Sequence, residues 1–143
     1  MSAQEIISKL PYSDPFLFVD ELSSISENEI TGSYLFKRNM PFYDGHFKGN
    51  PITPGVILTE CMAQIGVVCL GIFLMGDKLG ENPKIAMTST DIHFLNPVLP
   101  DEKVIVTSTK EYFRFGKLKC HVTMTNEEGE EVCNGFISGM IFQ

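Results

Sequence analysis

Basic charge is scarce in this 143-residue sequence, which has 11 Lys and Arg against 18 Asp and Glu and a net charge of −7. Because phosphate neutralisation dominates affinity for nucleic acids, this balance argues against a nucleic-acid-binding protein. Cysteine is also scarce, and no two of the four cysteines are spaced CxxC, which argues against a zinc ribbon or a redox pair. We expect four reduced, buried thiols in a cytoplasmic protein, at Cys61, Cys69, Cys120 and Cys133.

A hydrophobic run long enough to cross a bilayer is missing as well. The apolar stretch 65–76 has twelve residues, with Glu60 and Gln64 before it and Asp77 and Lys78 after it. A membrane-spanning helix needs roughly 20. The stretch therefore predicts a buried core helix and no membrane span. The first residues contain neither a basic nor an apolar region, so we expect no signal peptide.

The remaining composition is that of one globular domain. Hydrophobic residues make up 43% of the chain and charged residues 20%, and we find no internal repeat, low-complexity tract or domain boundary. We therefore predict a single domain over residues 1–143. A 16.0 kDa chain can bury only a modest core, so association with a second copy would help it.

The order of expected elements gives the fold class. Ser2 and Glu5 form a capping box for a short first helix. Thr53 is expected to cap a buried helix of about 22 residues, with Pro54 at its first position and its end near Met75. Strands are expected at 16–25 and 30–36 before this helix, and at 84–95, 102–113, 118–126 and 131–142 after it. This order predicts an α+β fold in which a curved antiparallel sheet wraps around a long central helix.

A candidate site lies where the loop 39–54 enters the long helix. His46 is an imidazole in a loop framed by glycine and proline, and such a group can abstract a proton near neutral pH. Gly55, expected at the second helical position, offers a backbone N–H at the positive end of the helix dipole. Such a donor can stabilise an oxyanion or polarise a carbonyl.

Glu60 is a lone carboxylate in an apolar helix, and Gln64 lies four residues later on the same face. Desolvation would raise the pKa of the Glu60 carboxyl, so that it could act as a general acid. Gln64 is expected to be its hydrogen-bond partner. The alternative is that His46 and Glu60 are structural, each satisfied by hydrogen bonds without any catalytic role.

The residues that surround these candidates resemble a known family. GHFKGNPITPGVILTECMAQ (45–64) resembles the active-site signature of the FabZ/FabA-type 3-hydroxyacyl-[acyl carrier protein] dehydratases. LPYSDPFLFVDEL (10–22), HFLNPVLPDEKV (93–104) and EYFRFGKLKCHV (111–122) are similar to other strands of that family. The resemblance implies a hot-dog fold and loss of water from a (3R)-3-hydroxyacyl thioester carried by acyl carrier protein. It implies no metal or cofactor, and a place in fatty-acid or related polyene or polyketide biosynthesis.

Carried over residue by residue, the resemblance makes His46 and Glu60 the catalytic pair. Gly55 would donate its N–H to the thioester carbonyl, and Gln64 would support Glu60. The carboxylate is Glu, as in the FabZ branch, rather than the Asp of the isomerising FabA branch. In the family the histidine and the carboxylate come from different protomers, which implies a homodimer and leaves open a higher oligomer or a heterodimer.

Two departures from the family pattern bear on the pathway. Pro11-Tyr12-Ser13 stands where Pro-His-Arg is common, and Asp101-Glu102 where Gly-Asp is usual. Neither touches the proposed acid and base. They leave open whether the chain serves housekeeping fatty-acid synthesis or a secondary pathway.

Other functions of the same fold also remain open. A hot-dog thioesterase would hydrolyse similar substrates, although the GHF-type histidine argues against it, and a non-catalytic acyl-binding subunit could keep the fold. Basic residues around an expected hairpin are candidates for docking the carrier: Arg114, Lys117 and Lys119, near Lys110. The alternative is a solvated hairpin whose charges only protect a sheet edge.

Overall fold

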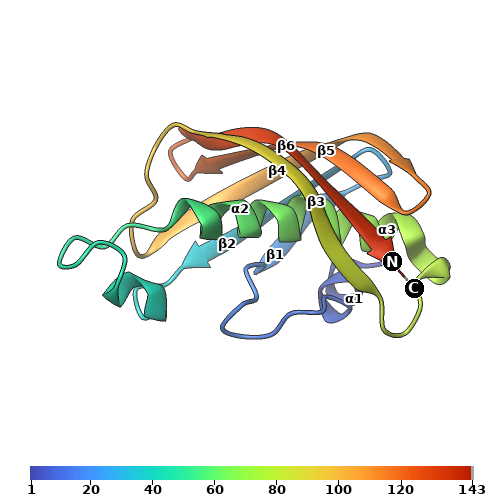
Figure 1. The fold of residues 1–143 in the computed structure, drawn as a ribbon, viewed down its shortest axis with the longest axis horizontal. Helices are drawn as coiled ribbons and strands as arrows, with labels where there is room; N and C mark the ends of the chain where they lie inside the picture. The colour runs from blue at the N-terminus through green and yellow to red at the C-terminus, as the bar shows by residue number, and fades with distance from the viewer. Residues whose placement is uncertain (143) are drawn as a thin grey trace.

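A six-stranded antiparallel sheet curls around one long helix in the computed structural model, which describes residues 1–142 (Figure 1). The spatial order of the strands is β1-β2-β4-β5-β6-β3. Their bounds are β1 (Glu21–Ile25), β2 (Glu29–Phe36), β3 (Lys84–Phe94), β4 (Glu102–Arg114), β5 (Lys117–Asn126) and β6 (Glu131–Phe142). The predicted α+β hot-dog architecture is confirmed.

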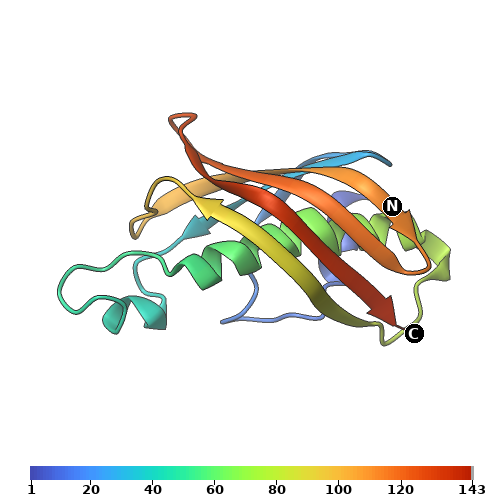
Figure 2. The ribbon, with the colours of Figure 1, turned by 45° about the horizontal axis from the view of Figure 1, so that its top comes forward.

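Strand periodicity explains which face of the sheet packs on the helix. In β2 every second residue is buried, including Ile30, Tyr34 and Phe36, and β5 repeats this pattern with Leu118 and Val122. Since successive side chains of a strand point to opposite faces, this alternation turns one apolar face toward the helix. Figure 2 shows the curved strands crossing above the helix on that face.

The central rod consists of three consecutive helical segments. They are α2 (Gly55–Ala63), the π-helical η2 (Gln64–Cys69) and α3 (Leu70–Met75), and a short 3₁₀ turn η3 (Gly76–Lys78) follows. The rod is long and apolar enough to cross a membrane, but 72% of its most apolar window is buried inside the protein. It is therefore the core helix that the sequence predicts.

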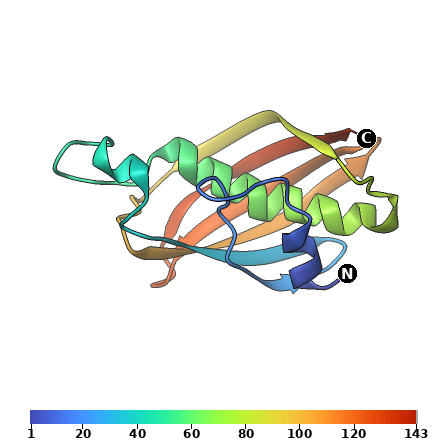
Figure 3. The ribbon, with the colours of Figure 1, turned by 90° about the horizontal axis from the view of Figure 1, so that it is seen from below.

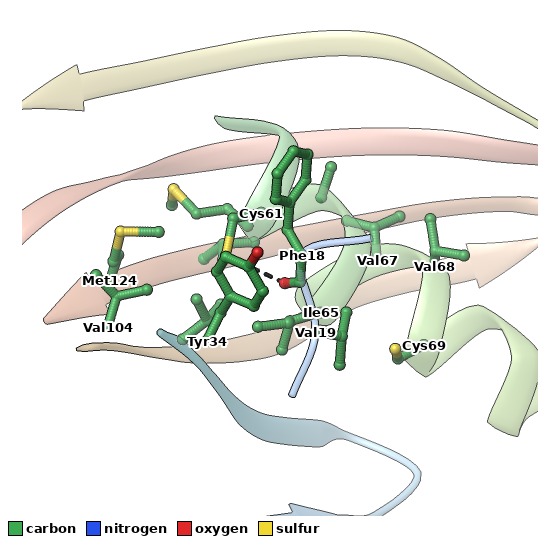
Figure 4. Packing of buried hydrophobic residues seen from close by; sticks show 14 of the residues in the cluster. Phe18, Val19, Tyr34, Cys61, Ile65, Val67, Val68, Cys69, Val104 and Met124 are labelled. Atoms are coloured by element: carbon green, nitrogen blue, oxygen red, sulfur yellow. Dashed lines mark hydrogen bonds between the residues drawn. The ribbon is translucent and has the colours of Figure 1, made fainter. Parts of the chain in front are cut away.

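The helix approaches the sheet closely at Gly66. A Cβ added there would lie 3.0 Å from the Cβ of Ser108, and the Ser108 hydroxyl donates a 2.8 Å hydrogen bond to the Gly66 carbonyl. Large buried side chains fill the core next to the helix, as Figure 4 shows for Phe18, Tyr34 and Ile65. The four cysteines lie in this core as free, buried thiols.

The N-terminal part crosses the side of the helix that the sheet leaves open (Figure 3). It begins with α1 (Ala3–Ser8), whose predicted capping box forms between Ser2 and Glu5. The expected strand at 16–25 is wrong in its first half, because only Glu21–Ile25 pairs with a neighbouring strand. The backbone of Phe16 and Phe18 is instead hydrogen-bonded to the side chain of Gln64 on the central helix. We call residues 12–19, which cross the helix here, the strap.

Two further expectations about the helix need correction. Pro54 is the N-cap and Gly55 the first helical residue, where the sequence suggested Thr53 and Pro54. The Thr53 N–H donates to the Val98 carbonyl, and its hydroxyl is hydrogen-bonded to Tyr43, so Thr53 is held by other elements and does not cap the helix. The π-helical segment was not predicted. Such a segment could be detected only as a shift in the spacing of apolar residues, and a helix that is apolar on all faces shows no such spacing.

Candidate active site

His46 lies in the loop between η1 (Pro41–Asp44) and α2, which projects from one end of the molecule (Figure 1). Its Nδ1 lies 2.9 Å from the Ile52 carbonyl oxygen, and its backbone N–H donates to the Phe42 carbonyl. A carbonyl can only accept, so Nδ1 carries the hydrogen. In the neutral ring Nε2 is then the unprotonated nitrogen, the form that a general base requires.

Gly55 provides a backbone donor at the start of α2. The N–H groups of the first helical turn have no acceptor within the helix, and no hydrogen bond from Gly55 N occurs in the part of the chain that the structure describes. The Phe94 ring covers the glycine so closely that an added Cβ would lie 3.2 Å from two of its carbons. Glycine at this position therefore lets a substrate reach the N–H beside the ring.

Glu60 is half-buried, and its carboxyl is held by Gln64. Burial raises the pKa of Glu60, and the hydrogen bond from Gln64 offsets part of that rise. The Gln64 Nε2 donates to Glu60 Oε2 at 2.9 Å and to the Phe16 carbonyl at 3.0 Å, while its Oε1 accepts the Phe18 N–H at 2.8 Å. The predicted partnership of Gln64 with Glu60 is therefore present in the structure.

The strap fixes which way the Gln64 amide points. Because Gln64 Oε1 is occupied by the Phe18 N–H, its NH₂ group must face Glu60. Oε2 of Glu60 is then an acceptor, and the proton of a neutral Glu60 resides on Oε1. Cys61, the next residue on the helix, also binds the strap through Sγ, 3.4 Å from the Phe18 carbonyl (Figure 4).

Three adjoining hollows follow the helix. The first, the His46 hollow, is lined by residues that include His46, Gly55 and Phe94. The second, the Gly55 hollow, shares Gly55 and Phe94 with the first and adds Glu60 and Met87. The third, the Glu60 cavity, shares Glu60 and Met87 with the second and holds about 230 Å³. None of these three hollows is lined by both His46 and Glu60, whereas Gly55 is shared by the His46 hollow and the Gly55 hollow, which Glu60 also lines.

The hollows open beside β3, which forms an edge of the sheet. Among the described residues 1–142, β3 pairs with β6 alone, and most of its residues are exposed. Exposed apolar side chains gather around this edge: Phe47 (60%), Val56 (77%), Met87 (44%) and Phe94 (51%). An unpaired edge with apolar neighbours is a surface on which another chain can pair.

The candidate docking residues cluster on the outer face of the β4–β5 hairpin. Arg114 and Lys117 are cross-strand partners. The Arg114 guanidinium lies 4.6 Å from the centre of the Tyr112 ring, and Lys119 Nζ lies 5.1 Å from that of Phe136. This hairpin turn is at the opposite end of the molecule from the His46 loop (Figures 1 and 2).

Lys110, which the sequence groups with these three cations, is not part of the cluster. Its Nζ lies 3.9 Å from a Glu27 carboxylate oxygen, on the side toward β2. A β-bulge between Lys110 and Tyr112 changes the register of the strand there, which the alternation pattern alone did not reveal.

Several residues that line the hollows were not predicted from the sequence as site residues: Tyr12, Phe16, Met87 and Phe94. They come from the strap and from β3, far from the helix in sequence. For Tyr12 a signal existed, since it stands where the family commonly has His. Met87 and Phe94 gave none, because apolar residues on a strand normally predict core.

Comparison with known proteins supports the resemblance. Residues 10–136 match the model of the FabA-like domain. The 3-hydroxyacyl-[acyl-carrier-protein] dehydratase FabZ of Ehrlichia chaffeensis is 35% identical over 98% of this chain and 94% of its own length. The FabZ of Rhizobium rhizogenes is 36% identical over 96% of this chain and 85% of its own length.

Solved structures are similar at lower identity and show the fold alone. The dehydratase heterocomplex ApeI:P of Xenorhabdus doucetiae has a TM-score of 0.76 at 11% identity, covering 96% of this chain and 91% of that one. A mutant form of the thioesterase PA1618 of Pseudomonas aeruginosa has a TM-score of 0.71 at 10% identity, covering 99% and 94%. With most of its length matched by the family model and by FabZ sequences at about one-third identity, the chain belongs to the FabA-like family, as a FabZ-type member.

Proposed function

We propose that the protein removes water from a (3R)-3-hydroxyacyl thioester and releases the trans-2-enoyl thioester. The observation that carries this proposal is the oriented Glu60 carboxyl, held by Gln64 next to a free helix N–H at Gly55. The FabZ relatives, whose names state this dehydratase activity, support it.

The three groups would divide the reaction between them. The Gly55 N–H binds the thioester carbonyl oxygen and stabilises the charge that develops when the α-proton leaves. Nε2 of His46 removes that proton, and Oε1 of Glu60 protonates the departing 3-hydroxyl. The C2–H and C3–O bonds break, the C2=C3 bond forms and water leaves. Afterwards His46 returns its proton to solvent and Glu60 regains one, so the reaction needs no redox cofactor.

We further propose that the working unit is a homodimer joined along β3. In a single chain His46 and Glu60 line different hollows, and both hollows open at the unpaired β3 edge. A two-fold related copy would bring its own His46 loop against the Glu60 of the first chain. Each site would then take its base from one protomer and its acid from the other.

One assay separates this function from its alternatives. The purified protein is incubated with a 3-hydroxyacyl thioester, and the products are identified by mass spectrometry and by the absorbance of the conjugated enoyl thioester. Enoyl thioester supports the dehydratase, free thiol would indicate a thioesterase, and neither would indicate a binding subunit. Only the first outcome is compatible with the proposal.

Mixed dimers test the shared site. His46→Ala and Glu60→Gln chains are each expected to be inactive, and re-associated mixtures should recover part of the activity because one of the two sites in a mixed dimer keeps both residues. Sedimentation should show a dimer. A fully active monomer, or a mixture that stays inactive while mixed dimers are shown to form, would contradict the shared site.

The substrate would arrive on an acyl carrier protein, and we place the reaction in the cytoplasm. Free thiols at all four cysteines suit a reducing compartment. The cations at Arg114, Lys117 and Lys119 suit an acidic carrier, because complementary charges speed encounter.

A further inference from the structure

A single phenol stands in the wall of the Glu60 cavity. The cavity is bordered by Tyr12 and Phe16 of the strap, by Ala63, Val67 and Val68 of the rod, and by residues of β3 and β6. Apart from Glu60 and Tyr12, the side chains that face it are apolar. Ser138 also borders it, but the neighbouring Gly139 is the residue that faces the helix, since a Cβ added there would lie 3.2 Å from Val67 Cγ1. Strand alternation turns the Ser138 side chain the other way.

The Tyr12 hydroxyl has no hydrogen-bond partner within residues 1–142, although its ring is fixed against Phe16, with ring centres 6.4 Å apart. Burial, with a smaller contribution from the Glu60 carboxyl, raises the pKa of Tyr12 to about 12. The phenol therefore remains a neutral O–H donor at every pH at which the protein would work.

The cavity follows the rod away from the reacting carbons. It extends from Glu60 to Val68, eight positions that span roughly 12 Å at helical rise. With the 3-hydroxyl at Glu60, this space would receive the part of the acyl chain beyond C3. An alkyl chain there would exclude water from the Tyr12 hydroxyl without giving it an acceptor.

We propose that Tyr12 is a specificity-determining residue, which favours acyl chains with an oxygen acceptor beyond C3 over saturated alkyl chains of equal length. The selection rests on the proposed dehydratase function. A hydroxyl that loses its water must find another acceptor, and leaving it unpaired corresponds to about a fivefold loss or more in affinity. An ether, hydroxyl or carbonyl oxygen placed opposite Tyr12 avoids that loss.

The test is a scan of matched substrates. A saturated 3-hydroxyacyl thioester is compared with analogues in which an ether oxygen replaces one methylene at each successive position beyond C4. Wild type should prefer one of these analogues by about fivefold or more in kcat/KM. Tyr12→Phe, which removes only the hydroxyl, should abolish that preference and improve turnover of the saturated substrate. Tyr34→Phe is the control, because its hydroxyl contacts Met40 Sδ at 3.6 Å, outside this cavity.

Binding of non-reactive analogues separates this proposal from the proposed function. Saturated and ether-containing S-alkyl pantetheine thioethers, which lack the thioester carbonyl and therefore cannot eliminate water, are titrated by calorimetry into wild type and Tyr12→Phe. If no 3-hydroxyacyl thioester is dehydrated, the proposed function fails, while a Tyr12-dependent preference in binding still upholds the cavity's selectivity. For each analogue, the ratio of the oxygen-containing to the saturated compound is compared between wild type and Tyr12→Phe. If this ratio is the same in both proteins for every analogue, in binding and in turnover, the role of Tyr12 is overturned.

Discussion

His46 and Glu60 are held in opposite ways. The His46 loop is fixed by short-range backbone contacts to Phe42 and Ile52, at the end of the molecule. Glu60 lies on the core helix and is fixed through Gln64 to the strap, about 45 residues earlier in the sequence. The loop can change with little effect on the fold, whereas a change around Glu60 alters the packing of the core.

The largest expected effect comes from the loop. His46→Ala should lower dehydration by about 10²–10⁴-fold, the usual contribution of a positioned base. Its unfolding free energy should fall by only about 0.5–1.5 kcal/mol, because the ring loses one hydrogen bond, to the Ile52 carbonyl. Lys48→Ala, an exposed change in the same loop, is the control and should retain activity. Wild-type turnover by His46→Ala would disprove the proposed base.

Glu60→Gln should be nearly as inactive, since an amide cannot deliver a carboxyl proton, but its stability should behave differently. The raised pKa of Glu60 means that the folded protein binds this proton more tightly than the unfolded chain does. Glu60 therefore loses its contribution to stability as the pH rises through the folded pKa. In thermal melts, the melting temperature of Glu60→Gln relative to wild type should therefore be higher at pH 8 than at pH 5. The same difference from wild type at both pH values would contradict this.

Much of this arrangement could be predicted from sequence. The Glu60–Gln64 contact follows from helical spacing. The burial of the rod was also predicted, but from an apolar run thought too short for a membrane; the rod is in fact long and apolar enough to cross one, and its burial inside the protein identifies it as a core helix. The strap could not be predicted, because Phe16 to Asp20 has the composition of a strand. Its backbone groups are bonded elsewhere: Gln64, distant in sequence, accepts the Phe18 N–H and donates to the Phe16 carbonyl, in place of a neighbouring strand.

The sequence alone also could not predict that His46 and Glu60 line different hollows. Fourteen positions along the chain indicate nothing about distance once a loop turns into a helix. The resemblance to the family supplied the shared site, and the open β3 edge gives that expectation a physical basis.

Breaking the link between Glu60 and the strap should have a smaller effect on rate. Gln64→Leu leaves the buried Phe18 N–H unpaired, which costs about 1–3 kcal/mol of stability. It also removes the hydrogen bond that lowers the pKa of Glu60, so that pKa should rise. Because Glu60 acts in its protonated form, the alkaline limb of kcat/KM should move to higher pH.

Cys61→Ala is the matched control for this change. It removes a second contact to the strap, between Sγ and the Phe18 carbonyl, but none to Glu60. It should lower stability and leave the alkaline limb in place. A limb that moves equally in both variants would show that Gln64 acts only through packing.

The smallest expected effect concerns the hairpin at the far end from the His46 loop. Arg114→Glu with Lys117→Glu reverses two cations that flank the turn, where Phe115 is 94% exposed. If an acidic carrier docks there, KM for carrier-bound substrate should rise severalfold at low salt, and the difference should shrink as salt screens the charges. Turnover of a carrier-free thioester should stay unchanged.

A second double variant shows whether position or total charge matters. Lys9→Glu with Lys37→Glu makes the same change in net charge at two exposed sites on other elements. If the hairpin is the docking surface, this variant should keep nearly the wild-type KM for the carrier-bound substrate. Equal increases in both double variants would mean that the carrier responds to the overall field of the protein, and no increase in either would leave the hairpin cations as ordinary solvated charges.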